Sequence, residues 1–277
     1  MSQVSASYQQ IVTATGCCGY IELGHGQPLI MLVGYSGNLL HWNSEFVSKL
    51  AQHFRVILPD NRKVGLSDST NPETMRGMAQ DVVDFMDALG LDSAYLLGWS
   101  MGGIIVQEFL LHFASRCLGA ALIASEPQIC YTTSDLHQLV NNLLTNPGSA
   151  ARAALGELFY SEAPSIEFRK YLAKVVLRIP HYVYPFNVVA QRLQDKIVAD
   201  WTGMNEEQLA AIKIPILLLA ARNDRVIPYA ASQYLFEHLP AAKLCLYSHG
   251  GHFFLNYYPC EIAQDIISFL MKKTEFN

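Results

Sequence analysis

The residues best suited to chemistry are centred on a serine between a predicted strand and a predicted helix. Ser100 lies in the pentapeptide Gly-Trp-Ser-Met-Gly at 98–102, the only G-x-S-x-G of the chain. A strand is predicted over 93–97 and a helix over 102–113, so a sharp turn would expose the hydroxyl at the helix N-terminus. A serine hydroxyl becomes a good nucleophile only when a base takes its proton and a third group orients that base. The motif therefore predicts nucleophilic catalysis with two partner residues.

Asp224 and His252, which both come later in the chain than Ser100, could be these partners. Asp224 follows a continuous apolar run over 214–220, and His252 follows a shorter run over 243–247. Such runs are typical of buried strands, and the carboxyl ends of parallel strands meet at one edge of a sheet. The order serine, acid, histidine also fits a serine nucleophile on an α/β sheet. We therefore expect His252 to act as the base for Ser100 and Asp224 to orient it.

Each partner has a rival in the sequence. His249 could be the base instead, but it is closer to the strand than His252 and no glycine pair precedes it. Glu126 follows the strand predicted over 118–124 and is the alternative acid to Asp224. Its position is more typical of a pocket wall or of a hinge to the cap.

The elements that must position these residues alternate along the chain, which indicates parallel strands joined by right-handed helical crossovers. An early hairpin is predicted over 10–14 and 20–23. The other strands are predicted over 28–33, 54–58, 93–97, 118–124, 214–220 and 243–247, and the helices over 75–89, 102–113, 230–238 and 259–271. Between 128 and 213 the alternation stops, and helices are expected over 136–144, 150–159, 166–177 and 188–198. We expect a core of residues 1–127 and 214–277, with 128–213 as a helical cap over the strand ends.

Two further motifs complete a resemblance to the α/β-hydrolase fold superfamily, which runs from about residue 24 to 270 and is weakest over the cap. The octapeptide DNRKVGLS at 60–67 is similar to the D-x-R-G-x-G-x-S loop of that family, and LVGY at 32–35 stands where many members have a His-Gly pair. Val33 replaces the usual histidine and Lys63 replaces a usual glycine. The resemblance implies an α/β fold, with a mostly parallel, eight-stranded type of sheet, helices on both faces and a helical cap.

The resemblance also implies a reaction. The backbone N–H groups of Tyr35 and Met101 would form the oxyanion hole, and Ser100 would carry an acyl group cleaved from a small to medium, fairly apolar carboxylic ester. The same three residues could cleave a carbon–carbon bond, lactone, thioester or amide, or the chain could bind a ligand with little turnover, as receptors of this fold do. The residues predicted to contact substrate are Gly34, Trp99, Glu126, His181, Tyr184 and Phe253.

Composition limits the kinds of partner, cofactor and cellular compartment that the sequence predicts. Of the 277 residues, 51% are hydrophobic and 16% are charged, the net charge is −5, and no basic block would favour a nucleic-acid partner. Apolar runs are too short to span a membrane, and the N-terminal residues do not resemble a signal peptide. Six scattered cysteines without a C-x-x-C pair are typical of free thiols in a reducing cytoplasm. No metal-ligand cluster or phosphate-binding loop is visible, so neither metal nor cofactor is expected. The oligomeric state is not encoded in any of these patterns.

Overall fold

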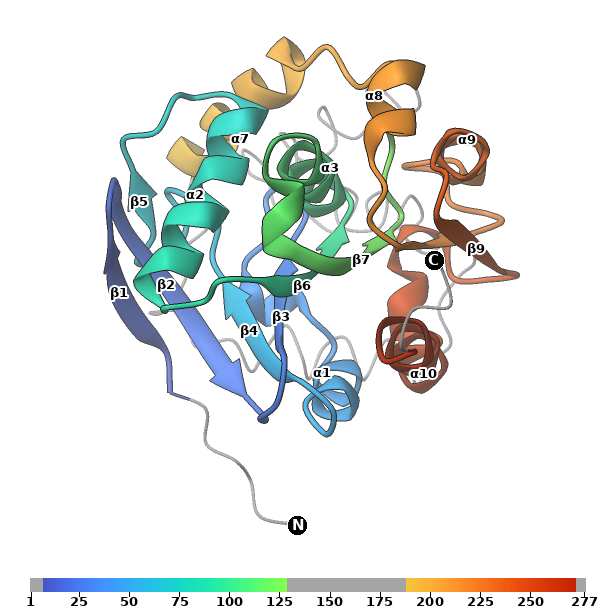
Figure 1. Ribbon diagram of the computed structural model, residues 1–277, viewed down its shortest axis with the longest axis horizontal. Coiled ribbons are helices and arrows are strands. Elements are labelled where there is room, and N and C mark those ends of the chain that lie inside the picture. The colour runs from blue at the N-terminus through green and yellow to red at the C-terminus, as the bar shows by residue number, and fades with distance from the viewer. Residues whose placement is uncertain (1–6, 129–187, 273–277) are drawn as a thin grey trace, which may run out of the picture.

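The computed structural model describes residues 7–128 and 188–272, in which strands and helices alternate (Figure 1). The strands are β1 (Gln9–Thr13), β2 (Gly16–Leu23), β3 (Pro28–Leu32), β4 (Arg55–Pro59), β5 (Asp68–Ser69), β6 (Ala94–Trp99), β7 (Cys117–Ile123), β8 (Ile216–Ala221) and β9 (Ala242–Tyr247). The helices are α1 (Ser44–Leu50), α2 (Met75–Ala88), α3 (Met101–Phe113), α7 (Val188–Asp200), α8 (Glu206–Ala211), α9 (Tyr229–His238) and α10 (Pro259–Leu270), with short 3₁₀ helices η1 (Leu39–His41), η2 (Ala114–Arg116) and η4 (Gly251–Asn256).

All nine strands of the described residues belong to one sheet, in the order β1-β2-β4-β3-β6-β7-β8-β9, with β5 paired to β2. The pairs β1–β2, β2–β4 and β2–β5 are antiparallel, and every pair from β4 across to β9 is parallel. The predicted α/β class and mostly parallel sheet are therefore confirmed. Because β3, β6, β7, β8 and β9 run in the same direction, the loops that follow them all lie at one edge of the sheet.

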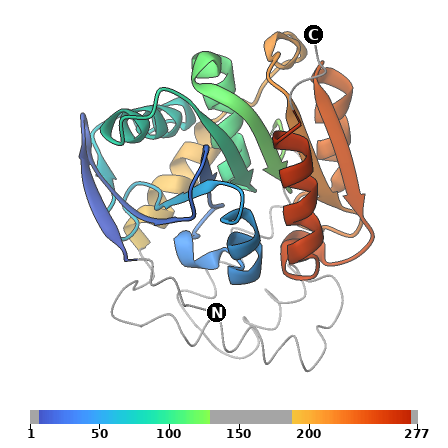
Figure 2. The same cartoon turned by 60° about the horizontal axis from the view of Figure 1, so that its bottom comes forward.

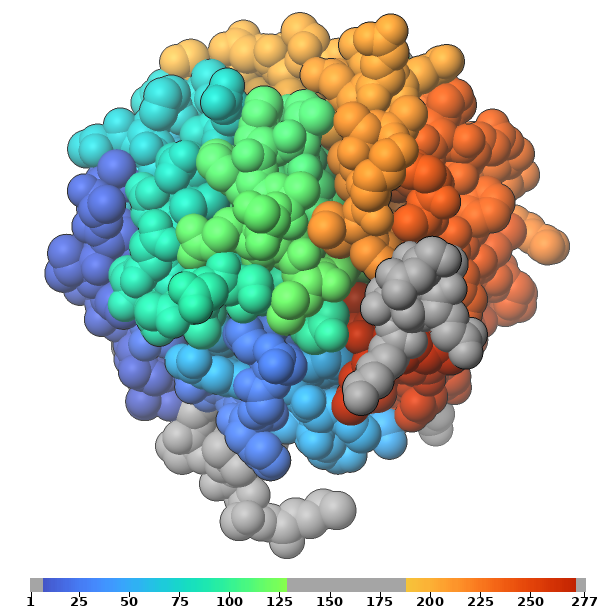
Figure 3. All heavy atoms as spheres, viewed as in Figure 1, coloured from blue at the N-terminus to red at the C-terminus, as the bar shows by residue number. Residues whose placement is uncertain are grey.

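Helices cover both faces of this sheet. On one face, α2, α3, α8 and α9 pack over apolar residues of the central strands, and on the other face α1 and α10 lie next to each other (Figures 1 and 2). The space-filling view shows α3 in direct contact with α2 on one side and with the α8 segment on the other (Figure 3). The central strands are consequently buried on both faces, which explains their unbroken apolar sequences.

The structure extends or adds several elements relative to the sequence patterns. The hairpin is present as β1 and β2, and the helix predicted over 188–198 is α7. The helices α1 and α8 and the two-residue strand β5 were not predicted, because short elements carry too few residues to show a period. In α1, the Asn43 side chain accepts hydrogen bonds from the N–H groups of Glu45 and Phe46 and so fixes the helix start. The predicted helices over 136–144, 150–159 and 166–177, and most of the predicted cap, lie outside the described residues.

Among the described residues, no helix has both the length and the apolar composition of a membrane span, and no three His, Cys, Asp or Glu residues are grouped so that they could hold a metal ion. The thiols of Cys18 and Cys117 are buried, and burial raises the pKa of each to about 12, so both stay protonated.

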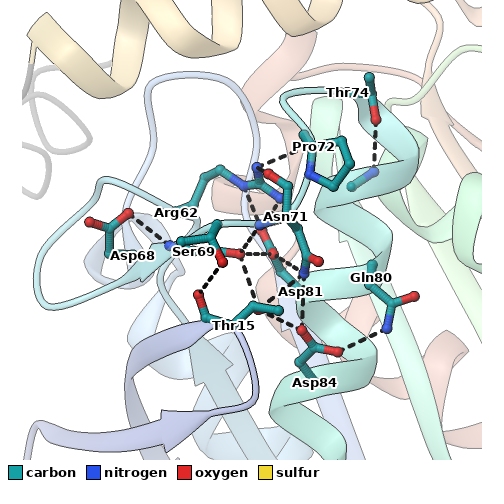
Figure 4. Close-up of polar contacts among 12 residues, drawn as sticks. Thr15, Arg62, Asp68, Ser69, Asn71, Pro72, Thr74, Gln80, Asp81 and Asp84 are labelled. Atoms are coloured by element: carbon teal, nitrogen blue, oxygen red, sulfur yellow. Dashed lines mark hydrogen bonds and ion pairs between the residues drawn. The ribbon is translucent and has the colours of Figure 1, made fainter.

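The loop between β4 and α2 is tied to α2 by a buried ion pair (Figure 4). The Arg62 guanidinium contacts Asp81 of α2 at 2.6 Å through both Nε and Nη2 and donates through Nη1 to the carbonyls of Asn71 and Pro72. Asp81 also accepts hydrogen bonds from Ser69 Oγ and Asn71 Nδ2. The guanidinium is thus hydrogen-bonded through Nε and Nη1, and its charge is paired with the Asp81 carboxylate, which is the condition under which burying a charge is tolerated.

Lys63, which stands where the related motif has glycine, takes a left-handed backbone conformation with φ = +64°. A lysine pays a steric cost there that glycine would not. Its exposed ammonium forms an ion pair with Asp68 at 2.6 Å. The substitution therefore changes the side chain at this turn while the turn keeps a conformation suited to glycine.

We expect Arg62→Ala to lower the free energy of unfolding by about 3 kcal/mol, because Asp81 would be left as a largely buried carboxylate without its cation. Urea denaturation measures this change. Glu73→Ala is the matched control, since it breaks an exposed ion pair with Lys196 and should leave the midpoint unchanged. Equal effects of the two substitutions would contradict the role assigned to the buried pair.

Candidate active site

Ser100 is the single residue between β6 and α3, and its backbone is strained. Its φ and ψ are 57° and −124°, a region that residues with a side chain rarely occupy. Two hydrogen bonds hold it there: the Ser100 N–H donates to the Ile123 carbonyl at 2.9 Å, and the Ser100 carbonyl accepts from the Gly103 N–H at 2.8 Å. The strand, turn and helix around the motif therefore place the serine as the sequence predicted.

The glycines of the motif are required by close backbone packing. A Cβ on Gly98 would lie 2.4 Å from the Gly102 carbonyl oxygen, and one on Gly102 would lie 2.0 Å from the Leu32 carbonyl oxygen. Both distances are far below any normal contact with a carbon atom. The turn at Ser100 can form in this position only because these residues have no side chain.

The loop after β3 runs directly beside Ser100. A Cβ on Gly34 would lie 2.9 Å from Ser100 Cβ and 3.4 Å from Ser100 Oγ, so the backbone leading into Tyr35 is next to the serine hydroxyl. Met101 is the first residue of α3, where a backbone N–H has no acceptor within the helix. The predicted oxyanion residues Tyr35 and Met101 thus lie on two segments that are directly next to Ser100.

This loop is anchored by side chains of the segment that follows β4. Asn61 Nδ2 donates to the Val33 carbonyl at 3.2 Å, and Asp60 Oδ1 accepts from the Leu39 N–H at 2.9 Å. Val33, which replaces the usual histidine, is itself fully buried in the apolar core. The loop therefore keeps polar anchors although the side chain at position 33 is apolar.

The structure joins Asp224 to His252. Asp224 Oδ2 lies 2.9 Å from His252 Nδ1, and the two side chains are only 1% and 2% exposed. The other carboxylate oxygen of Asp224 accepts hydrogen bonds from the N–H groups of Val226 and Ile227 at 2.8 and 3.0 Å. An Asp224 carboxylate fixed on both oxygens keeps the proton of neutral His252 on Nδ1 and leaves Nε2 as an acceptor.

Two more contacts hold the histidine loop in place. Asn223 Oδ1 accepts from the Gly251 N–H at 3.3 Å, so adjacent side chains of one loop bind adjacent residues of the other. The indole N–H of Trp99 donates to the His252 carbonyl at 3.3 Å, and the Trp99 ring packs against the rings of His252 and Phe253. Trp99 is thus a buried support directly behind the histidine.

The two rival residues follow strands that end at the same edge of the sheet. His249 is exposed, whereas His252 is buried against Asp224. Glu126 is buried after β7, and its backbone carbonyl accepts a hydrogen bond from Gln107. Of the residues predicted to contact substrate, Gly34, Trp99, Glu126 and Phe253 lie at the edge of the sheet that carries Ser100, while His181 and Tyr184 lie outside the described residues.

The Tyr35 side chain points to helix α7. Its hydroxyl donates to Asp195 and accepts from Gln191 Nε2 at 3.1 Å, while Gln194 Oε1 accepts from the Ser36 N–H at 2.7 Å. Burial and the neighbouring Asp195 raise the pKa of Tyr35 above its ordinary value, so the phenol stays protonated and donates.

The sequence patterns missed these α7 residues and Asn223. One signal was present: Gln191, Gln194 and Asp195 have the i, i+3, i+4 spacing of one helix face, and buried apolar residues flank them. Polar residues within an apolar helix face indicate a buried polar contact, although not with which partner.

Known proteins resemble this chain over most of its length. The family model described as alpha/beta hydrolase fold matches residues 27–256. A protein named putative carbamate hydrolase RutD from Caulobacter sp. (strain K31) is 29% identical over 255 residues, covering 88% of this chain and 90% of that protein.

Two solved structures have the same fold. An alpha/beta hydrolase fold protein from Chitinophaga pinensis superposes with a TM-score of 0.83 at 24% identity, over 98% of this chain and 100% of the other. The esterase RhEst1 from Rhodococcus sp. ECU1013 superposes with a TM-score of 0.78 at 22% identity, over 97% and 100% of the two chains.

We expect Gly34→Ala to lower the free energy of unfolding by about 1–3 kcal/mol, because the new methyl group would meet Ser100 Cβ and, at 3.1 Å, the Trp99 carbonyl. Thermal unfolding measures the loss. In the control Gly119→Ala, the methyl would meet only side-chain atoms of Leu270 and Tyr95 at 3.3–3.4 Å, so the loss should be smaller. A larger loss in the control would show that the loop beside Ser100 can move away freely.

Proposed function

The chain belongs to the alpha/beta hydrolase fold family, and we propose that it is a serine hydrolase that cleaves small to medium, fairly apolar carboxylic esters. The observation that carries this proposal is the buried hydrogen bond between Asp224 and His252, which lies at the same edge of the sheet as the strained turn of Ser100. A histidine fixed in this way is a suitable base for a serine hydroxyl.

In the proposed acylation step, Ser100 Oγ attacks the ester carbonyl carbon while its proton moves to His252 Nε2. The carbonyl oxygen becomes negative and accepts hydrogen bonds from the Tyr35 and Met101 N–H groups. The tetrahedral intermediate then expels the alcohol, which takes the proton from His252 and leaves an acyl group on Ser100. Water, deprotonated by His252, attacks this acyl group in the same manner and releases the acid.

The Asp224 carboxylate does not accept a proton in this scheme. It holds the N–H at Nδ1 of His252, which fixes the tautomer that can act as a base, and it stabilises the imidazolium formed in each half of the reaction. Since both oxygens of Asp224 are already hydrogen-bonded, its orientation does not have to change during the cycle.

Carbamate cleavage is the second candidate. It is favoured by the relatives named putative carbamate hydrolase RutD, several of which match more than four fifths of this chain. The same steps apply to a carbamate, except that His252 gives its proton to a leaving amine or alcohol. Comparing p-nitrophenyl esters with carbamates that have the same leaving group separates the two activities.

We expect Ser100→Ala to lower kcat for p-nitrophenyl butyrate by about 10⁴-fold or more, because the acyl-enzyme can no longer form. A fluorophosphonate probe should label the wild-type protein and fail to label the variant. Turnover or labelling that is equal in both proteins would refute the proposal. The control His249→Asn should retain wild-type turnover, since His249 is exposed.

We expect Asp224→Asn to lower kcat by about 10³–10⁴-fold with little change in stability. The Asn carbonyl would accept from Val226 and Ile227 as the carboxylate does, so its NH₂ group would face His252 Nδ1. That contact places the imidazole proton on Nε2, where it blocks the base. Steady-state kinetics and thermal unfolding measure the two quantities, and a greater loss of kcat in Glu126→Gln would show that Glu126 is the acid.

A further inference from the structure

Helix α7 contacts the backbone of the loop that carries Tyr35. Gln194 Oε1 accepts a hydrogen bond from the Ser36 N–H at 2.7 Å, and the Gln194 side chain is completely buried. The two residues are far apart in the sequence, since α7 belongs to the insertion between β7 and β8. A buried side chain whose carbonyl oxygen accepts a hydrogen bond from one backbone N–H fixes the position of that peptide group.

The side chain of Tyr35 is held by the same helix. Its hydroxyl donates to Asp195 and accepts from Gln191. The two residues joined by this peptide bond, Tyr35 and Ser36, are therefore both attached to consecutive turns of α7. Tyr35 is therefore fixed through its phenol, and Ser36 through its backbone.

The loop would not hold this shape by local forces alone. Ser36 has φ = +57°, a left-handed conformation that is unfavourable for serine. The turn is closed by a hydrogen bond from the Gly37 N–H to the Gly34 carbonyl at 3.1 Å. Because Tyr35 is the second residue of this turn, the direction of its own N–H depends on the conformation that the Ser36 contact maintains.

We propose that Gln194 and Asp195 are positioning residues of the active site, which orient the Tyr35 N–H toward the developing oxyanion. This inference rests on the proposed function, in which that N–H is an oxyanion donor. It adds a role for the insertion: α7 aligns the catalytic loop in addition to covering the core. A donor that is displaced by about 1 Å loses much of its effect on the transition state while leaving substrate binding nearly unchanged.

The test replaces the acceptor of Gln194 and keeps its size. Gln194→Met removes the acceptor, and Gln194→Glu keeps an oxygen for the Ser36 N–H. Lys196→Ala is the matched control on the same helix, because it breaks only the exposed ion pair with Glu73. The assays are hydrolysis of p-nitrophenyl butyrate, inhibition by propyl trifluoromethyl ketone and inhibition by the product butyrate. The ketone forms a tetrahedral adduct when Ser100 Oγ adds to its carbonyl carbon, the serine proton moves to His252 and the ketone oxygen takes the oxyanion position.

We expect Gln194→Met to lower kcat by about 10- to 100-fold with KM changed less than about threefold. Inhibition by the ketone should weaken by the same factor as kcat/KM, whereas inhibition by butyrate should not change. Gln194→Glu should restore part of kcat, and Lys196→Ala should match the wild type. A role limited to docking α7 would instead weaken ketone and butyrate binding together.

Three results would overturn the inference. Gln194→Met could retain wild-type kcat, lose ketone and butyrate binding equally, or match Lys196→Ala in every assay. If Gln194→Met unfolds below the assay temperature, Tyr35→Phe takes its place, and the same results decide. Absence of Ser100-dependent turnover in the wild type would refute the proposed function itself, whereas normal wild-type turnover with an unaffected variant would refute only the positioning role.

Discussion

The structure depends most on the close approach of backbone segments around Ser100. Only Ser100 separates β6 from α3, and the segment that follows β3 passes directly against that turn. Gly98, Gly102 and Gly34 leave the space that these crossings need, and a side chain at any of them would collide with a carbonyl or with Ser100 itself. The unfavourable backbone of Ser100 is maintained by hydrogen bonds to Ile123 and Gly103, so the core supports a strained residue that could not hold its conformation alone.

The parallel sheet converts this local constraint into a site. β3, β6, β7, β8 and β9 point the same way, so the loops that carry Tyr35, Ser100, Glu126, Asp224 and His252 meet at one edge although they are spread over most of the chain. Within this edge, the loop after β8 supplies both the carboxylate that binds His252 and the amide that binds the residue before it. The orientation of His252 is thus set by the loop after β8 and by Trp99, which packs against the imidazole. The register of the strands fixes where that loop and Trp99 lie.

The segments between the strands are attached to this framework by buried polar contacts. Arg62 and Asp81 fasten the loop after β4 to α2, and that loop in turn anchors the backbone after β3 through Asn61. In addition, Gln194 and Asp195 of α7 hold Ser36 and Tyr35. The loop beside Ser100 is therefore fixed by side chains from two separate parts of the chain.

The sequence by itself determined the class of fold, the serine turn and the order of the three candidate residues. Apolar periodicity and glycine spacing are properties of short stretches of sequence, so they can be recognised without a structure. The sequence also placed Asp224 and His252 after strands of the same sheet, although it left His249 and Glu126 as rivals. Only the tertiary structure paired Asp224 with His252 and exposed His249. The contacts of Asn223 and Gln194 were decided at the same level, since a hydrogen bond between residues tens to more than a hundred positions apart depends on distances that no periodic pattern contains.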